Sequence, residues 1–376
     1  MKKFIYADNA ATTKLDVEAF EAMKPYMLDC FANPSQPYSL SRESKKALKQ
    51  ARRNIAEAIG ALESEIYFTS GGTESDNWAI KSVALNGKGG AILTSEVEHH
   101  AVLKSCEWVE KQGCPVIYMT PNSAGVITSD ILNKYINKNT KLVSIMLVNN
   151  EVGSISPIQE LAKIAHDNGA LFHTDAVQAV GHIKIDVKEL GVDMLSASAH
   201  KFNGPKGVGF LYVKSGLTLN AFIDGGAQES GLRAGTENVA NVVGMGVALR
   251  ENVNALYEIN KKLQAIEQSF FKVLDMQSID YVRNGAKNHV PGNINISIAG
   301  ANGESLLHRL DLKGIYISTG SACDSVNNQI SHVIKAIGVP EKYAEGTIRI
   351  TFGKDSTIED AEIVASSIAD ILTEVR

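Results

Sequence analysis

The sequence contains few cysteines, with only four among its 376 residues, at positions 30, 106, 114 and 323. They are scattered along the chain and no two form a C-x-x-C pair, so a disulfide framework is excluded. Cys106 and Cys114 flank a segment with helical character, and we expect them to pack as small apolar side chains. Cys323 instead lies among small and polar residues that do not form a core.

A strong excess of one charge is also absent, as is any long apolar run. The net charge is -5 at pH 7, whereas nucleic-acid-binding proteins carry a marked basic excess or stripe. No apolar run approaches the ~20 residues needed to span a bilayer. Near the N-terminus the charged Asp8 follows too soon for the apolar region of a signal peptide. We therefore expect a cytoplasmic protein that binds neither nucleic acid directly nor a membrane.

The composition that remains is that of a globular protein with a packed core, with 44% hydrophobic and 21% charged residues. Segments with strand character are residues 66–69, 91–94, 116–119, 142–148, 171–174, 194–199 and 207–213. Helical segments between them include residues 44–59, 74–85, 101–111 and 158–168. This alternation predicts an α/β fold with a mainly parallel sheet covered on both faces. The last strand follows a short Gly/Pro turn, so we expect it to be antiparallel.

The pattern changes from about residue 257 onward, where helices and strands no longer alternate regularly. The expected elements there are helices at 258–274, 331–337 and 358–374 and strands at 293–298, 315–318 and 347–352. This arrangement is typical of a smaller α+β domain. We therefore predict a large domain over residues 16–257 and a small domain formed by residues 1–15 and 258–376.

Unusual polar residues follow three of the predicted strands, where ligands bind in parallel sheets. After residues 66–69 comes a glycine-rich turn with Gly72 and Thr73 at the start of a helix. Free backbone N–H groups and the positive helix end can bind a phosphate there, although an ordinary capped helix start would look the same. Asp175 follows the strand at 171–174 and could either cap a helix or pair with a cationic ring nitrogen.

Lys201 follows the strand at 194–199 and precedes a tight Gly-Pro turn. Burial lowers the pKa of a lysine amine, and the neutral amine can form a Schiff base with an aldehyde. A phosphate site, an acid for a pyridinium nitrogen and a lysine for an aldehyde together describe pyridoxal 5'-phosphate. Each signal is weak alone, but all three fall on strand ends of one sheet.

With these residues in place, the chain resembles the cysteine desulfurases, class-V aminotransferase-like enzymes of the nitrogen-fixation and iron–sulfur-cluster type. The matching motifs, in the order of the family, are DNAATT (8–13), NPS (33–35), TSGGTES (69–75), EHHAV (98–102), VNNEVG (148–153), Asp175 with Gln178, SAHK (198–201), RAGT (233–236), STGSAC (318–323) and Arg349. The resemblance covers nearly the whole chain. It implies fold type I of the pyridoxal-phosphate-dependent transferases, with a mainly parallel seven-stranded sheet and a smaller α+β domain.

The resemblance also implies a role for each matching residue. Lys201 would hold the cofactor and move protons, His99 would stack on its ring, and Asp175 would pair with its ring nitrogen. Gln178 would bind the ring hydroxyl, and Asn150 would lie beside the ring or the substrate carboxylate. The phosphate would be bound by Gly72, Thr73, Ser198, His200 and, from the second subunit of a homodimer, Thr236. Arg349 would bind the substrate carboxylate, since a guanidinium matches a carboxylate bidentately.

Cys323 determines which reaction the resemblance implies. An exposed free thiol is normally disfavoured because it is reactive, so its presence in this loop suggests a functional role for Cys323. Cysteine desulfurases remove sulfur from L-cysteine, release L-alanine and hold the sulfur as a cysteine persulfide. The expected partner is a sulfur-acceptor protein, for iron–sulfur cluster assembly or thiolation. No metal ligands are assigned, although Cys323 could transiently contact an iron–sulfur cluster on a partner.

Three alternatives remain open at this stage. A selenocysteine lyase would share almost every cofactor-binding residue. An aminotransferase of the same fold would not need Cys323. A sulfur-delivery binding module would turn over cysteine slowly unless its partner were present. Two positions also depart from the family, since Tyr38 and Ser41 replace its usual His and Gly.

Overall fold

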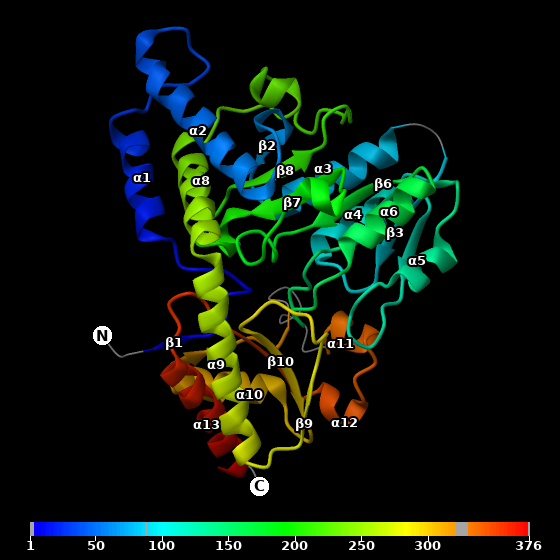
Figure 1. The fold of residues 1–376 in the computed structure, drawn as a ribbon, viewed down its shortest axis with the longest axis vertical. Coiled ribbons are helices and arrows are strands. Elements are labelled where there is room, and N and C mark those ends of the chain that lie inside the picture. Colours follow the sequence, from blue (N-terminus) through cyan, green and yellow to red (C-terminus); the bar gives the residue numbers. More distant parts are fainter. Residues whose placement is uncertain (1–3, 87–88, 321–329, 375–376) are drawn as a thin grey trace.

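The computed structural model describes residues 4–86, 89–320 and 330–374 (Figure 1). Its largest element is a seven-stranded sheet with the order β2-β8-β7-β6-β5-β3-β4. The strands are β2 (Ile66–Thr69), β3 (Ala91–Ser95), β4 (Val116–Met119), β5 (Thr140–Ser144), β6 (Leu171–Asp175), β7 (Met194–Ser198) and β8 (Gly209–Val213). Strand β8 is antiparallel to both neighbours, whereas β7, β6, β5, β3 and β4 pair in parallel. The predicted α/β fold, with its mainly parallel sheet and antiparallel last strand, is confirmed.

Helices cover both faces of this sheet because its strands carry apolar side chains on both sides. Alternate residues such as Leu93, Phe172 and Leu195 join one apolar cluster, which includes residues of helices α2, α6 and α8. The intervening Ile92 and Met194 join another cluster, with residues of α3 and α4. The helices are α2 (Arg42–Ile59), α3 (Gly72–Leu85), α4 (His100–Lys111), α5 (Ser129–Tyr135), α6 (Ile158–Asp167), α7 (Val187–Leu190) and α8 (Val239–Asn254). Burial on both faces explains why the strands have continuous apolar sequences.

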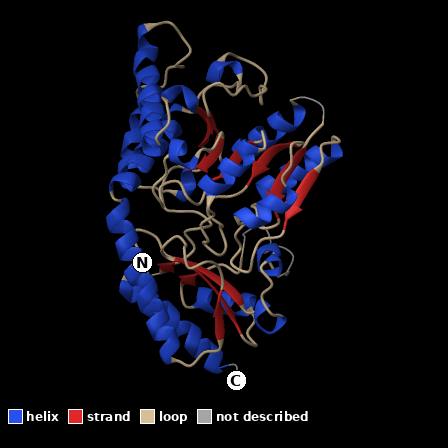
Figure 2. Cartoon of the chain, turned by 45° about the vertical axis from the view of Figure 1, so that its right-hand side comes forward, coloured by secondary structure: helices blue, strands red, loops and turns tan. Residues whose placement is uncertain are grey.

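The rest of the chain forms a second layer of sheet and helices around its own apolar cluster (Figure 2). Strand β10 (Asn293–Ile298) lies between β9 (Tyr281–Arg283) and β12 (Thr347–Thr351), antiparallel to both. The N-terminal β1 (Ile5–Tyr6) pairs in parallel with β11 (Ile315–Tyr316). The helices are α9 (Leu256–Met276), α10 (Gly303–Leu312), α11 (His332–Ala336), α12 (Glu341–Ala344) and α13 (Ile358–Glu374). The division at residue 257 into a large and a small domain stays a prediction.

Two local differences from the sequence-based expectations have clear causes. The strand expected over residues 142–148 ends at Ser144, because the chain then turns and Val148 bridges to Ile155. That turn carries residues 149–153 toward the ends of the strands. Helix α1 (Val17–Leu28) was not predicted, because only Ala19 and Met23 of this helix are buried and no apolar stripe marks it.

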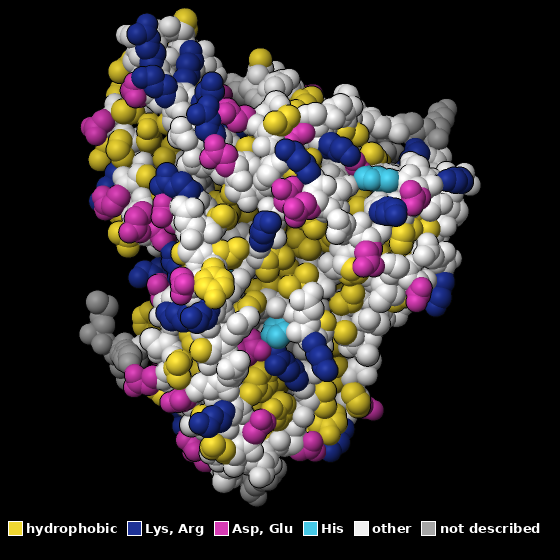
Figure 3. All heavy atoms as spheres, in the orientation of Figure 1, with side chains coloured by type: hydrophobic (Ala, Val, Ile, Leu, Met, Phe, Trp, Pro, Cys, Tyr) yellow, Lys and Arg dark blue, Asp and Glu magenta, His cyan; other side chains and the backbone are white. Residues whose placement is uncertain are grey.

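The surface carries mixed charge. On the face of Figure 3, lysine and arginine side chains gather at the upper left, over the end of α2, which carries exposed Arg42, Lys45, Lys46 and Lys49. Acidic and basic side chains are interspersed over the rest of that face. Within the described residues, no helix combines the length and apolarity needed to cross a membrane.

Candidate active site

The site is built at the carboxyl ends of β2, β6 and β7, which the pairing register brings close together. Thr69 of β2 lies opposite Gly209 of β8, and Gly209 lies opposite Ser198 of β7. A side chain at Gly209 would approach the Gly71 Cα within 2.7 Å. Only glycine therefore lets the turn before α3 cross the antiparallel strand and reach Ser198.

The start of α3 forms a cradle of backbone N–H groups, because the first N–H groups of a helix have no partner within the helix. Gly71 has φ +154°, a conformation that L side chains rarely adopt, and a Cβ there would lie 3.4 Å from the Ser198 hydroxyl. Gly72 begins the helix, and a Cβ on it would approach Val177 within 2.4 Å. Thr73 is exposed at the same end. The positive end of this 14-residue helix, with Thr73 and Ser198 beside it, suits a phosphate group.

Asp175 ends β6 next to this cradle and is 4% exposed. One of its carboxylate oxygens accepts a hydrogen bond from the Val177 N–H at 2.9 Å. Burial raises the pKa of Asp175 to about 6, against the lowering effects of that N–H and of the Lys201 charge. A buried carboxylate with one hydrogen bond is poorly compensated, so this position suits a cationic nitrogen of a ligand.

Lys201 reaches the same region from η3 (Ala199–Lys201), directly after β7. Its ammonium donates to the carbonyls of Ala10 at 2.5 Å and Ala11 at 2.9 Å. The Gln178 amide donates to the same Ala10 carbonyl at 2.9 Å. The N-terminal DNAATT segment therefore contacts both predicted cofactor residues, which sequence reasoning had not assigned to it.

Two histidines of the predicted site have defined roles in the local structure. His99 is the N-cap of α4, where its Nδ1 accepts from the Ala101 N–H at 3.1 Å, which fixes the orientation of the ring. His200 lies 3.1 Å from the Thr12 hydroxyl through Nδ1. Burial, and then the charges of Lys201 and Lys206, lower the pKa of His200 to about 4. His200 is therefore neutral at neutral pH and would bind a phosphate by hydrogen bonding rather than by charge.

The structure brings Arg349 and Asn150 together, and their role in binding a substrate carboxylate stays a prediction. Arg349 on β12 is 1% exposed and donates to the Asn150 carbonyl at 3.1 Å. It also forms an ion pair with Asp8 at 2.7 Å. Its Nε–H has no hydrogen-bond partner among the described residues. Asp8 is a partner of Arg349 that sequence reasoning missed, since a position 341 residues away gives no local signal.

Two predicted residues are not placed in this constellation. Thr236 is exposed in the loop before α8, and that loop is held to α3 by an ion pair of Arg233 with Glu74 at 2.8 Å. Whether Thr236 completes the site of a second subunit stays a prediction. Cys323 lies outside the described residues. Among those residues there is no group of His, Cys, Asp and Glu side chains that could hold a metal ion.

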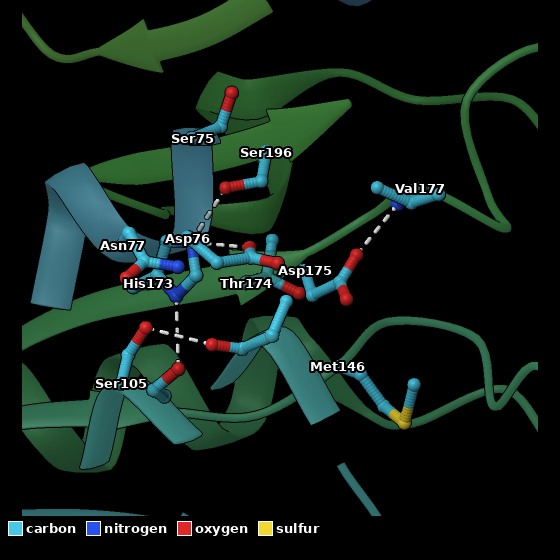
Figure 4. Close-up of polar contacts among 12 residues, drawn as sticks. Ser75, Asp76, Asn77, Ser105, Met146, His173, Thr174, Asp175, Val177 and Ser196 are labelled. Carbon is cyan, nitrogen blue, oxygen red and sulfur yellow. Dashed lines mark hydrogen bonds and ion pairs between the residues drawn. The ribbon is translucent and has the colours of Figure 1, made fainter. Parts of the chain in front are cut away.

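A group of buried titratable residues beneath Asp175 was also missed by sequence reasoning. Asp76 of α3 lies beside His173 of β6 and Ser196 of β7, while Asp175 is turned toward Val177 (Figure 4). Glu98, before α4, is fully buried as well. Desolvation raises the pKa of Glu98 to about 8. The signal in the sequence is the polar end of the strand that begins with Leu171 and Phe172, where His173 precedes Thr174 and Asp175.

Comparison with known proteins shows the family of this chain. Residues 5–364 match the family described as aminotransferase class-V. A cysteine desulfurase IscS of Dictyoglomus turgidum is 48% identical over 100% of this chain and 96% of its own length. That of Methanosarcina thermophila is 45% identical over 100% of this chain and 93% of its own length.

Solved structures give the same result. One titled NifS-like protein has a TM-score of 0.93 at 34% identity, covering 99% of this chain and 100% of that one. Another, titled SspA in complex with cysteine, has a TM-score of 0.83 at 37% identity, covering 93% of this chain and 99% of that one. By its family match, its full-length similarity and its fold, the chain belongs to the aminotransferase class-V family, within its cysteine desulfurases.

Proposed function

We propose that this protein uses pyridoxal 5'-phosphate to convert L-cysteine into L-alanine, with the sulfur kept as a persulfide on Cys323. The balanced reaction is L-cysteine plus a protein thiol, giving L-alanine plus a protein persulfide. The acceptor of that sulfur would be a partner protein in iron–sulfur cluster assembly or thiolation. A homodimer in which Thr236 completes the neighbouring site, and a cytoplasmic location, are parts of the same proposal.

The observation that carries the proposal is the convergence of three ligand-binding features at one sheet edge. The glycine cradle of α3 offers N–H donors, Asp175 offers a buried carboxylate, and Lys201 offers an amine. These features fit the phosphate, the ring nitrogen and the aldehyde of pyridoxal phosphate. When bound, this cofactor supplies an electron sink for negative charge on the amino-acid Cα.

Residues of the chain would bind the cofactor and the substrate and transfer the protons. Asp175 would hold a proton on the ring nitrogen by pairing with its positive charge. Lys201, released from the cofactor by substrate, would take the proton from the substrate Cα. Arg349 would fix the substrate carboxylate, and its Nε–H, which has no partner in the part of the chain that the structure describes, supports this role. The Cys323 thiolate would then attack the substrate sulfur, and the C–S bond would break.

The test is a single-turnover experiment with L-cysteine, comparing the wild type with Cys323→Ala. The wild type should release one alanine per site and carry one persulfide. The variant should bind L-cysteine, seen as a change in the visible absorbance, and release no alanine. Cys114→Ala is the matched control, since Cys114 is a half-buried cysteine remote from this chemistry.

Other outcomes would point elsewhere. If Cys323→Ala releases alanine as fast as the wild type, Cys323 is a bystander and the persulfide route is wrong. If L-selenocysteine is cleaved by that variant while L-cysteine is not, the protein acts as a selenocysteine lyase. If the wild type turns over only after an acceptor protein is added, it is primarily a sulfur-delivery module.

The pH dependence of cofactor binding follows from Asp175. Its pKa is about 6, so the carboxylate is ionised above pH 6 and protonated below it. Only the ionised form pairs with a cationic ring nitrogen. Affinity for pyridoxal phosphate should therefore be constant above pH 7 and fall by about tenfold per pH unit below pH 6.

A fluorescence titration of the cofactor-free protein between pH 5 and 8 measures this affinity, and Asp175→Asn should remove its dependence on pH. An unchanged pH profile in that variant would assign the titration to another group.

A further inference from the structure

Asp76 is a buried acid that has no role in the proposed reaction. It is the fifth residue of α3, which begins at Gly72, and it is 1% exposed. The helix that carries it begins with the phosphate cradle, so Asp76 links that cradle to the core of the sheet. Its neighbours in Figure 4 come from β6 and β7, the strands that end in Asp175 and lead to Lys201.

The hydrogen bonds around Asp76 leave its carboxyl group poorly compensated. One of its oxygens, Oδ1, has no hydrogen-bond partner among the described residues, and the nearest histidine nitrogen, His173 Nε2, lies 3.6 Å from it. Both ring nitrogens of His173 are already engaged, Nε2 with the Ser196 hydroxyl at 2.9 Å and Nδ1 with the Ser144 hydroxyl at 2.8 Å. The contact of Asp76 that favours an ionised carboxylate is with the Ser196 hydroxyl.

The charges that face Asp76 come from every element packed around it. Asp175 of β6 and Glu98 before α4 are acids, and Cys106 of α4 lies within electrostatic range of Asp76. In the part of the chain that the structure describes, no lysine or arginine contributes to the electrostatics of Asp76 or Glu98, and Lys201 acts on Asp175.

Histidine does not supply the missing positive charge. Burial lowers the pKa of His173 to about 3, so this imidazole is neutral at neutral pH. Among the described residues, three carboxyl groups therefore share a buried region in which the Lys201 charge acts on Asp175, while no cation acts on Asp76 or Glu98. Neighbouring acids in such a region cannot all be ionised, because each charge raises the cost of the next.

We propose that Asp76 is a positioning residue that keeps its proton in the working protein, filling the space beside Asp175 with a neutral carboxyl group. The negative charge at the end of β6 is thereby confined to Asp175, the group that faces the cofactor. Desolvation, followed by the charge of Asp175, raises the pKa of Asp76 well above its ordinary value, in agreement with this geometry. The inference rests on the proposed function, because it assigns Asp175 to the ring nitrogen.

Infrared difference spectroscopy of the cofactor-bound protein tests the protonation directly. The wild type minus Asp76→Asn spectrum at pH 7 should show the carbonyl stretching band of a protonated carboxyl group, with its shift in heavy water. Asp167→Asn, which changes an exposed acid on α6, should leave that band in place. A wild-type spectrum in which Asp76→Asn removes carboxylate bands instead would overturn the inference.

Cofactor affinity gives a second readout, which separates a protonated Asp76 from an ionised one. Asparagine has the shape and charge of a protonated aspartic acid, so the fall in affinity below pH 6 should keep its midpoint within 0.3 pH units, about twofold in affinity. If Asp76 were ionised, removing its charge would shift that midpoint to lower pH by a unit or more, about tenfold. A shift of that size contradicts the inference.

A second variant keeps the test valid if Asp76→Asn does not fold. Ser196→Ala retains the acid but removes its hydroxyl contact, so the protonated-carboxyl band should move in frequency without disappearing. A band that Ser196→Ala leaves unaltered belongs to another acid and overturns the inference. Alanine and persulfide release from the wild type is measured separately. If the wild type releases no alanine and forms no persulfide, the proposed function is rejected. The infrared result still decides whether Asp76 is protonated.

Discussion

Replacing Lys201 by alanine is expected to lower the rate of alanine formation by at least about 10³-fold, since a positioned proton-transfer group alone contributes 10² to 10⁴. The variant should still bind pyridoxal phosphate through the α3 cradle and Asp175. It should lose that cofactor on dialysis, because the covalent link to the protein is gone. The measurements are single-turnover alanine release and the visible spectrum before and after dialysis.

Lys206→Ala is the matched control for this variant. Lys206 lies five residues further along the same turn, and its side chain is exposed. It should bind cofactor and form alanine as the wild type does. Lys201 also donates to the carbonyls of Ala10 and Ala11, so thermal unfolding of both variants must be compared. A Lys201→Ala protein that stays folded and retains normal turnover would remove Lys201 from the chemistry.

Replacing Arg349 by lysine is expected to raise KM for L-cysteine by about 10²-fold, the effect of losing a buried bidentate carboxylate contact. Lysine keeps the positive charge beside Asp8, so the ion pair that holds β12 to the N-terminal segment is retained in part. It cannot present two parallel N–H groups to a carboxylate. The rate at saturating L-cysteine should change much less than KM, because binding of the carboxylate is similar before and during the reaction.

The control for Arg349→Lys is a variant of a distant arginine, and KM of both variants is measured by steady-state kinetics. Arg309→Lys is suitable, because Arg309 lies on α10 and donates to the Ile371 carbonyl of α13, away from the site. It should leave KM unchanged. Arg349→Ala is less informative, since it would leave Asp8 without its charge partner and destabilise the fold by about 3 to 5 kcal/mol. An unaltered KM in Arg349→Lys would mean that another group binds the substrate carboxylate.

Much of the fold could be predicted because both faces of its main sheet are buried. Strands such as β2 and β6 therefore appear as short apolar runs, and the Gly/Pro turn before β8 requires an antiparallel return. The predictions were least accurate where burial leaves no such pattern. Helix α1 buries only two residues, and β5 ends early because the chain turns at residues 145–148 to form the loop that contains Asn150.

By itself, the sequence determined which residues follow the strands of the main sheet, and from these it predicted the chemistry of the proposed site. Lys201, Asp175 and the glycines before α3 each follow a strand, and the direction of parallel strands places such residues at one edge of a sheet. Only the tertiary structure decided which distant groups surround them. Asp8 meets Arg349, and the carbonyl of Ala10 meets Lys201 and Gln178. Asp76 and Glu98 share a buried region near Asp175. The physical reason is that desolvation and charge coupling depend on burial and separation in space, and residue order along a chain specifies neither until the chain has folded.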